Sequence, residues 1–284
     1  MRLRGGAKRG AQLVWKGIKL HSASAICVCF ALLTFNARAD EAPRPDFGWR
    51  QAWTGADVHS NGWLMYAGAT VAPYSDIYSD GLRLRATTGY GGYGWEGKPD
   101  PDRPLLAQPK GNATTDYADL LVGYYKQMGP ATVKAFIGAA MIEHHLGDIN
   151  CRDNICDPET VRSELVHGTD WGPKAAFEIW LNIGSDAFAS FDASYTTAHD
   201  TFSSHTRLGY RVLPTVSAGL EAAVNTNAKN NFFSENMPDY RGGVFVRYEW
   251  FTGEVAVSGG FTTGDFGNIS ENSLYGTLNY ATRF

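Results

Sequence analysis

The chain has 284 residues, of which 25 are Lys or Arg and 29 are Asp or Glu, so its formal net charge is −4. This balance argues against nucleic-acid binding, which requires clustered basic side chains that displace counterions from phosphates. Beyond residue 39 no apolar run reaches the roughly 18 residues of a membrane-spanning helix, although a closed β-barrel crosses a bilayer without one.

Residues 1–39 have the pattern of a cleaved signal peptide. A basic region without acids precedes the apolar stretch 22–35, and the A-R-A sequence at 37–39 supplies a small-x-small cleavage site. A mitochondrial presequence is the alternative, but the compact apolar stretch and the cleavage site favour secretion. Cleavage removes seven basic residues and no acidic ones, so residues 40–284 keep 18 basic and 29 acidic residues and a net charge of −11.

Residues 40–284 predict an all-β protein, an antiparallel up-and-down transmembrane β-barrel of about 12 strands. Runs of about ten residues alternate apolar and polar side chains between clusters of Gly, Asn, Asp and Pro. Twelve such runs occur, at 50–59, 62–72, 81–93, 114–126, 131–143, 169–182, 186–198, 201–213, 215–226, 239–250, 252–263 and 273–284.

The connections between these runs alternate in length, as in outer-membrane barrels with short periplasmic turns and long outer loops. The short ones are 127–130, 183–185, 214 and 251, with 73–80 a moderately long exception, and the long ones include 94–113, 144–168, 227–238 and 264–272. The final run ends on the aromatic Phe284, which is typical of outer-membrane barrels and also compatible with a sandwich strand. Together these features favour a barrel in the bacterial outer membrane over a periplasmic β-sandwich.

Two cysteines remain after cleavage, Cys151 and Cys156, and both fall in the longest predicted loop, 144–168. In an oxidising compartment such a close pair predicts a disulfide that pins a small loop. A zinc site would need further ligands, for which His144 and His145 are the nearest candidates, and we expect the disulfide.

Each run has an apolar face and a face that carries charges of both signs. In 239–250, for example, Val244 and Val246 share one face, whereas Arg247 and Glu249 share the other. Because Arg or Lys on the lipid face costs roughly 2–4 kcal/mol at the bilayer midplane, we expect the charged face to line the lumen. The candidate lumen charges are Arg83, Arg85, Lys174, Glu178, Arg207, Glu221, Arg247 and Glu249.

Aromatic residues have two expected roles. Amphipathic rings collect at membrane interfaces, and the residues that map to the periplasmic strand ends are Trp49, Trp53, Trp250 and Phe284. In the glycine-rich segment TGYGGYGW, three rings could stack on sugars, although an aromatic girdle or loop packing is the interpretation we favour. These candidates are Tyr90, Tyr93 and Trp95.

No catalytic, cofactor or metal site is predicted. Ser203 and His205 share a strand face, as a lipid hydrolase would need, but Arg207 and Arg211 share that face too, which indicates lumen rather than lipid. The glycines of TGYGGYGW lack the Lys-Ser/Thr ending and the following helix of a phosphate loop.

Four segments, 53–73, 81–97, 207–222 and 240–261, resemble the cellulose biosynthesis protein BcsS family in their strand-and-turn patterns. The resemblance implies a secreted, non-enzymatic outer-membrane barrel that assists synthesis, export or surface organisation of bacterial cellulose, a β-glucan. It implies outer-membrane lipid, other cellulose synthase or secretion components and the glucan chain as partners. It carries over no catalytic residues. A small-solute or ion channel and a barrel enzyme acting on outer-membrane lipid are the alternatives.

Overall fold

The computed structural model describes most of the region predicted as a barrel. The described residues are 48–96, 109–150, 157–226, 239–263 and 273–284. The predicted signal peptide, 1–39, and the cysteines Cys151 and Cys156 lie outside these residues, so the cleavage and the disulfide stay predictions.

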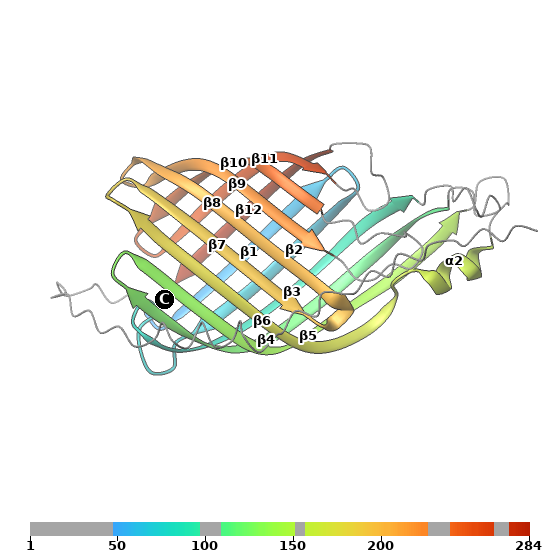
Figure 1. Ribbon diagram of the computed structural model, residues 1–284, viewed down its shortest axis with the longest axis horizontal. Helices are drawn as coiled ribbons and strands as arrows, with labels where there is room; N and C mark the ends of the chain where they lie inside the picture. Colours follow the sequence, from blue (N-terminus) through green and yellow to red (C-terminus); the bar gives the residue numbers. More distant parts are fainter. Residues whose placement is uncertain (1–47, 97–108, 151–156, 227–238, 264–272) are drawn as a thin grey trace, which may run out of the picture. The chain divides into compact units, whose positions relative to one another are not determined.

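The described residues form twelve antiparallel strands that close into a barrel (Figure 1), which confirms the predicted fold class. Each strand pairs with its neighbours in the chain, and the last strand pairs with the first from Gln51↔Arg283 to His59↔Tyr275. The strands are β1 (Arg50–His59), β2 (Gly62–Val71), β3 (Gly81–Glu96), β4 (Lys110–Met128), β5 (Ala131–Asn150), β6 (Gly168–Ile183), β7 (Ala187–Thr196), β8 (Thr201–Leu213), β9 (Val216–Thr226), β10 (Asp239–Trp250), β11 (Gly253–Thr263) and β12 (Ser273–Arg283).

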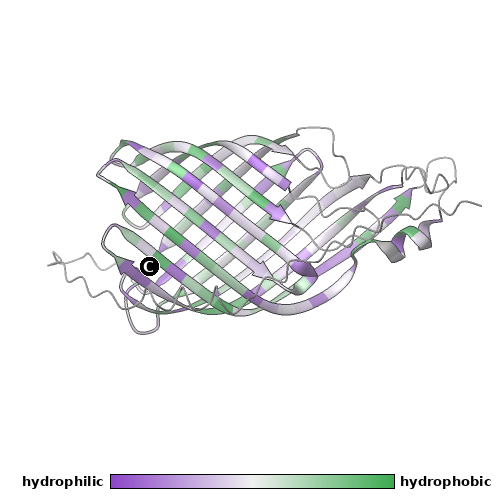
Figure 2. Cartoon of the chain, viewed as in Figure 1, coloured by the Kyte–Doolittle hydropathy of each residue, from purple (hydrophilic) through white to green (hydrophobic). Residues whose placement is uncertain are grey.

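The period of two in the sequence decides which side chains face outward. In β10, Val244 is 59% exposed whereas the next residue, Phe245, is 2% exposed. The same contrast separates Leu274 from Tyr275 in β12. Figure 2 shows this alternation of apolar and polar residues along the strands. The closed sheet leaves no open edge, so a chain of this kind can satisfy its backbone groups within lipid.

Exposed aromatic rings gather at the end of the barrel where β1 begins and β12 ends. Trp250 lies between Tyr248 and Tyr280, with ring centroids 5.9 and 5.8 Å away. Trp53 was predicted to belong to this interfacial group, and that prediction was wrong. The odd-numbered residues of β1 face the lumen, so the Trp53 ring points inward and lies against Gly68. Four connections of two or three residues, 129–130, 184–186, 214–215 and 251–252, lie at this end, which therefore corresponds to the periplasmic side.

Strands β3–β6 are longer than the others and extend beyond them at the opposite end of the barrel (Figure 1). The predicted loops 94–113 and 144–168 are therefore shorter than expected, because β4 and β5 go on pairing to Lys110↔Asn150. A short helix, α2 (Pro158–Glu164), covers this extension, and Trp95 is buried there against Val161 and Leu165. A 3-10 turn, η3 (Ala198–Asp200), joins β7 to β8. Neither helix in the described ranges is long enough to cross a membrane.

Candidate functional site in the barrel lumen

The inner wall carries ion pairs that reach across several strands. Glu178 of β6 accepts from Lys134 of β5 over 2.8 Å and also pairs with Arg85 of β3, which lies three strands away. The side chains of Lys134 and Glu178 are 34% and 23% exposed, so water reaches this group. A second pair joins Lys174 to Asp119 over 2.6 Å. These contacts neutralise charges that would otherwise be costly to bury.

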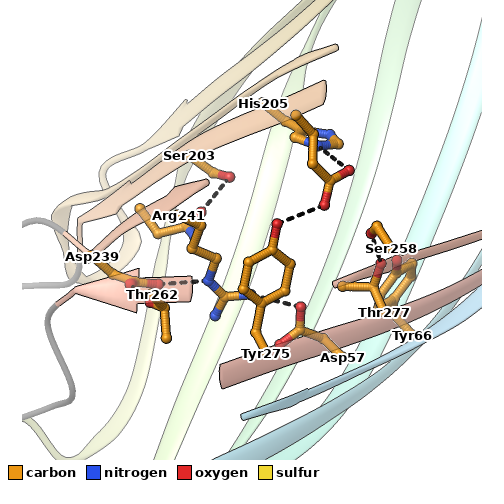
Figure 3. A network of polar contacts seen from close by, with 12 residues as sticks. Asp57, Tyr66, Ser203, His205, Asp239, Arg241, Ser258, Thr262, Tyr275 and Thr277 are labelled. Atoms are coloured by element: carbon orange, nitrogen blue, oxygen red, sulfur yellow. Dashed lines mark hydrogen bonds and ion pairs between the residues drawn. The ribbon is translucent and has the colours of Figure 1, made fainter. Parts of the chain in front are cut away.

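Glu221 of β9 is the centre of a second group. Its carboxylate accepts from Arg207 Nε over 3.0 Å and from the Tyr275 hydroxyl over 2.8 Å, and it contacts His205 Nε2 at 3.2 Å. The side chain is only 4% exposed. Figure 3 shows Tyr275 and His205 on opposite sides of this carboxylate. Charge-assisted hydrogen bonds from β8 and β12 offset its burial and fix its position.

The same network continues to the strands that close the barrel. Arg241 of β10 pairs with Asp57 of β1 over 2.6 Å and with Asp239 over 2.8 Å (Figure 3). The hydroxyl of Tyr66 in β2 donates to Asn279 of β12. Polar side chains therefore bridge the β12–β1 seam inside the lumen, in addition to the backbone pairing.

The connection between β2 and β3, residues 72–80, folds against the inner wall at the periplasmic end. Arg83 is 1% exposed and donates to the carbonyls of Asp76 and Ile77 and to Ser75 Oγ, each over 3.1 Å. It also donates to the Ser79 carbonyl. An inward-facing arginine thus holds the whole loop by its backbone.

Tyr78 connects this loop to the inner wall at β12. The guanidinium of Arg283 in β12 lies 5.0 Å from the centre of its ring. Burial raises the pKa of Tyr78 to about 12; the nearby Arg283 opposes this shift, whereas Glu254 and Glu249 add to it. Since Arg83 belongs to β3 and Arg283 to β12, the loop spans the inner wall from β3 past β2 and β1 to β12 at the periplasmic end.

Several inward aromatic rings lie flat against glycines of a neighbouring strand. A Cβ on Gly68 would lie 2.4 Å from Trp53 Cζ2, and one on Gly89 would lie 2.1 Å from Tyr117 Cε1. Tyr66 covers Gly55 in the same way. Only glycine leaves room for a ring at these positions, and the ring in turn shields the strand backbone.

All eight candidate lumen charges occupy inward-facing positions of their strands. Besides the groups already described, Arg247 pairs with Glu249 over 2.5 Å and lies 4.7 Å above the ring of Trp180. Seven of the eight take part in ion pairs, whereas Arg83 donates to the loop 72–80 instead, and their role in function stays a prediction.

The three candidate stacking aromatics do not share a surface. Tyr90 is exposed on the outer face, where its ring meets Trp63 at 5.5 Å. Tyr93 faces inward and its hydroxyl contacts His144 Nδ1 at 3.1 Å, whereas Trp95 is buried below α2. Three inward rings, Trp53, Tyr66 and Tyr117, were not predicted to face the lumen. The signal that could have revealed them is a glycine in each facing strand.

Ser203 and His205 do not form an activated nucleophile in this arrangement. Ser203 Oγ donates to Asn225 Oδ1 over 2.8 Å, and His205 is engaged with Glu221. A serine nucleophile requires a base within hydrogen-bond reach of its own hydroxyl. Across the described ranges of the chain there is also no group of three metal-ligating residues.

Solved structures similar to this chain include an outer membrane channel from Pseudomonas putida F1, with 12% identity, 88% of this chain and 100% of the other covered, and a TM-score of 0.44. LpxR from Salmonella typhimurium has 11% identity over 83% and 100% of the two chains, with a TM-score of 0.45. The KdgM porin has 9% identity over 82% and 99%, with a TM-score of 0.42. We draw no functional assignment from these structures.

Comparison with curated proteins finds no match. A family model, described as cellulose biosynthesis protein BcsS, matches residues 51–284, which include every strand except the first residue of β1. The chain therefore belongs to the cellulose biosynthesis protein BcsS family.

Proposed function

We propose that this protein is a non-enzymatic outer-membrane barrel that organises or anchors cellulose during its synthesis and export. The observation that carries the proposal is the family match across the whole barrel, residues 51–284. The expected partners are outer-membrane lipid, the cellulose synthase or secretion components, and the glucan chain itself.

The lumen supports a neutral ligand better than a charged one. Most of its charged groups occur as pairs, such as Lys174 with Asp119 and Arg241 with Asp57. Pores that select ions or phosphates by charge are lined by rings of one sign, whereas cellulose carries no charge. A lumen whose charged side chains are mostly paired therefore fits a polymer that is recognised by its hydroxyl and C–H groups.

The periplasmic end of the lumen favours organisation or anchoring over passage of the polymer. Residues 72–80 lie against the inner wall at this end and are held from β3 by Arg83 and from β12 by Arg283. A glucan chain that passed through the barrel would have to pass this loop, which takes up space inside the periplasmic end. A role at the membrane surface makes no such demand.

The proposal is tested by deleting the gene in its native bacterium and restoring it on a plasmid. We expect the amount or the surface attachment of secreted cellulose to change on deletion and to return on complementation. Unchanged cellulose in the deletion strain would remove the assignment while leaving the fold intact. Fractionation and unheated electrophoresis should place the protein in the outer membrane as a band that shifts on boiling.

A small-solute or ion channel is the second candidate, because side chains inside the lumen are reached by water. His205 is 31% exposed and Lys134 is 34% exposed. Recordings in planar bilayers separate the two functions. An organising barrel should show little steady conductance, whereas a large steady conductance would favour the channel.

The lipid-enzyme alternative is tested with the double variant Ser203→Ala and His205→Ala. We expect no lipid turnover in the parent protein and no change in the variant. Lipid hydrolysis by the parent that disappears in the variant would establish the enzyme and overturn the non-enzymatic proposal.

A further inference from the structure

Two classes of aromatic rings that face the lumen differ in what covers them. In the first class an arginine covers the ring: Arg85 lies 4.1 Å from the centre of Phe136, and Arg207 lies 5.1 Å from that of Phe245. Phe188 is covered in the same way by guanidinium groups at 5.0 and 5.5 Å. These rings are occupied by cation–π contacts within the protein.

The second class consists of Trp53, Tyr66 and Tyr117, whose rings have no such cover. Within the described part of the chain, neither a guanidinium nor a second aromatic ring stacks on any of the three. One face of each ring lies on a glycine of the inner wall, so the opposite face is directed into the lumen. All three side chains are partly exposed.

The register places these three rings next to one another. Trp53 pairs with Gly68 and Tyr66 pairs with Gly55, two consecutive inward pairs between β1 and β2. Gly89 of β3 then lies between Tyr66 on one side and Tyr117 on the other. The rings therefore form one patch on the β1–β4 wall, spaced by glycines that keep the wall flat.

Polar groups border this patch. Asn279 accepts the Tyr66 hydroxyl, and Asp57 faces inward two residues beyond Gly55, where Arg241 holds it at 2.6 Å. The Asn279 amide and the Asp57 carboxylate are held in place by their own partners. Both offer oxygen lone pairs to sugar hydroxyls, and the amide also offers N–H groups. The arrangement combines flat apolar faces with a few placed polar groups, as small-molecule and saccharide sites do.

β-Linked glucose fits such a surface because all its ring substituents are equatorial. Both faces of the pyranose then present C–H groups, which the negative face of an aromatic ring attracts, while the hydroxyls point sideways. A β-1,4-glucan is a flat ribbon that repeats this pattern, whereas an α-1,4-glucan coils. We propose that Trp53, Tyr66 and Tyr117 form a stacking surface that binds a segment of β-glucan inside the lumen; the choice of this polymer rests on the proposed function.

The test measures binding of cellohexaose to the purified, detergent-solubilised barrel by calorimetry. We expect saturable binding in the parent, binding about tenfold weaker in Tyr117→Leu and in Trp53→Leu, and retained binding in Tyr117→Phe, which keeps the ring. The matched control is Tyr90→Leu, which removes a tyrosine from the outer face of β3 and should leave binding unchanged. Maltohexaose, the α-linked counterpart, should bind more weakly than cellohexaose.

Each variant is first checked for closure by its shift on unheated gels. If a leucine variant fails to close, the parent is compared with Trp53→Phe, in which the change of tryptophan emission on adding cellohexaose should be lost. Absence of saturable cellohexaose binding in the parent would overturn the inference, as would equal binding by Tyr117→Leu and Tyr90→Leu. If deletion of the gene alters cellulose but the parent does not bind cellohexaose, the inference fails and the proposed function survives. If the parent binds cellohexaose but deletion of the gene leaves cellulose unchanged, the inference survives and the proposed function fails.

Discussion

Replacing Arg83 with methionine should release the loop 72–80 from the periplasmic end of the barrel. The guanidinium is 1% exposed and donates to Ser75 Oγ and to the Asp76 and Ile77 carbonyls, each over 3.1 Å. Methionine matches much of the arginine stem but offers no donor. The loop acceptors would then need water at a site that now excludes it.

The expected cost follows from these contacts. A hydrogen bond to a charged group contributes about 1.5–3 kcal/mol, and such contributions are not additive when one side chain makes several of them. Each acceptor left without a donor costs about 1–3 kcal/mol and water near the barrel mouth will replace part of the loss, so we expect the free energy of unfolding to fall by about 3–5 kcal/mol. The lost contact with the Tyr125 ring, whose centre lies 4.9 Å from the guanidinium, adds to this in the same direction.

The assay is urea unfolding of the refolded barrel in detergent, followed by tryptophan emission and by the gel shift on boiling. The matched control is Lys126→Met, which removes a cation that pairs with Asp80 of the same loop at the exposed rim. Those side chains are 27% and 36% exposed, so this loss should stay below about 1 kcal/mol. Equal effects of the two variants would refute the idea that Arg83 fixes the loop, and so would an Arg83→Met barrel whose conductance matches that of the parent.

Three further outcomes are expected. Lys174→Met should lower the free energy of unfolding by about 3–5 kcal/mol in urea, because it leaves the Asp119 carboxylate, 2% exposed, without its cation. Gly89→Val should displace the Tyr117 ring, cost about 1–3 kcal/mol and weaken cellohexaose binding, since even a Cβ would lie 2.1 Å from that ring. Tyr78 should stay neutral until the pH approaches about 12, above its ordinary value of 10.0, so its contribution to stability is complete below pH 10.0 and is lost as the pH rises through about 12. An ultraviolet titration of the parent against Tyr78→Phe checks this, and a difference spectrum that titrates near 10.0 would contradict it.

The barrel itself could be predicted because its physical signal is local. Alternation with a period of two assigned Val244 to the outside and Arg247 to the inside, and a one-residue error would have reversed both. The signal failed where alternation is weak. β1 carries small and polar residues on both faces, and Trp53 was therefore placed in the interfacial girdle although it lies inside.

The lumen site depends on register, which local patterns do not contain. Gly89 pairs with both Tyr66 and Tyr117 only because β2, β3 and β4 are aligned as they are. The contact between Arg83 and the loop 72–80 depends in the same way on how the loop folds back. The local pattern alone instead pointed to the aromatic residues of a glycine-rich segment, of which Trp95 is buried below α2.

The loop 72–80 also bears on whether a polymer could pass through the barrel. If the contacts of Arg83 stabilise the closed loop by about 3–5 kcal/mol, thermal opening would populate the open state in only about one molecule in 10² to 10⁴. Passage would then require a periplasmic partner that binds the open loop more tightly than the closed one by a similar free energy. Anchoring requires no such partner, because a glucan segment on the ring patch at Tyr66 would leave the loop in place. A conductance that rises only when a periplasmic component is added would identify a gated conduit, whereas cellohexaose binding by the isolated barrel without conductance would identify an anchor.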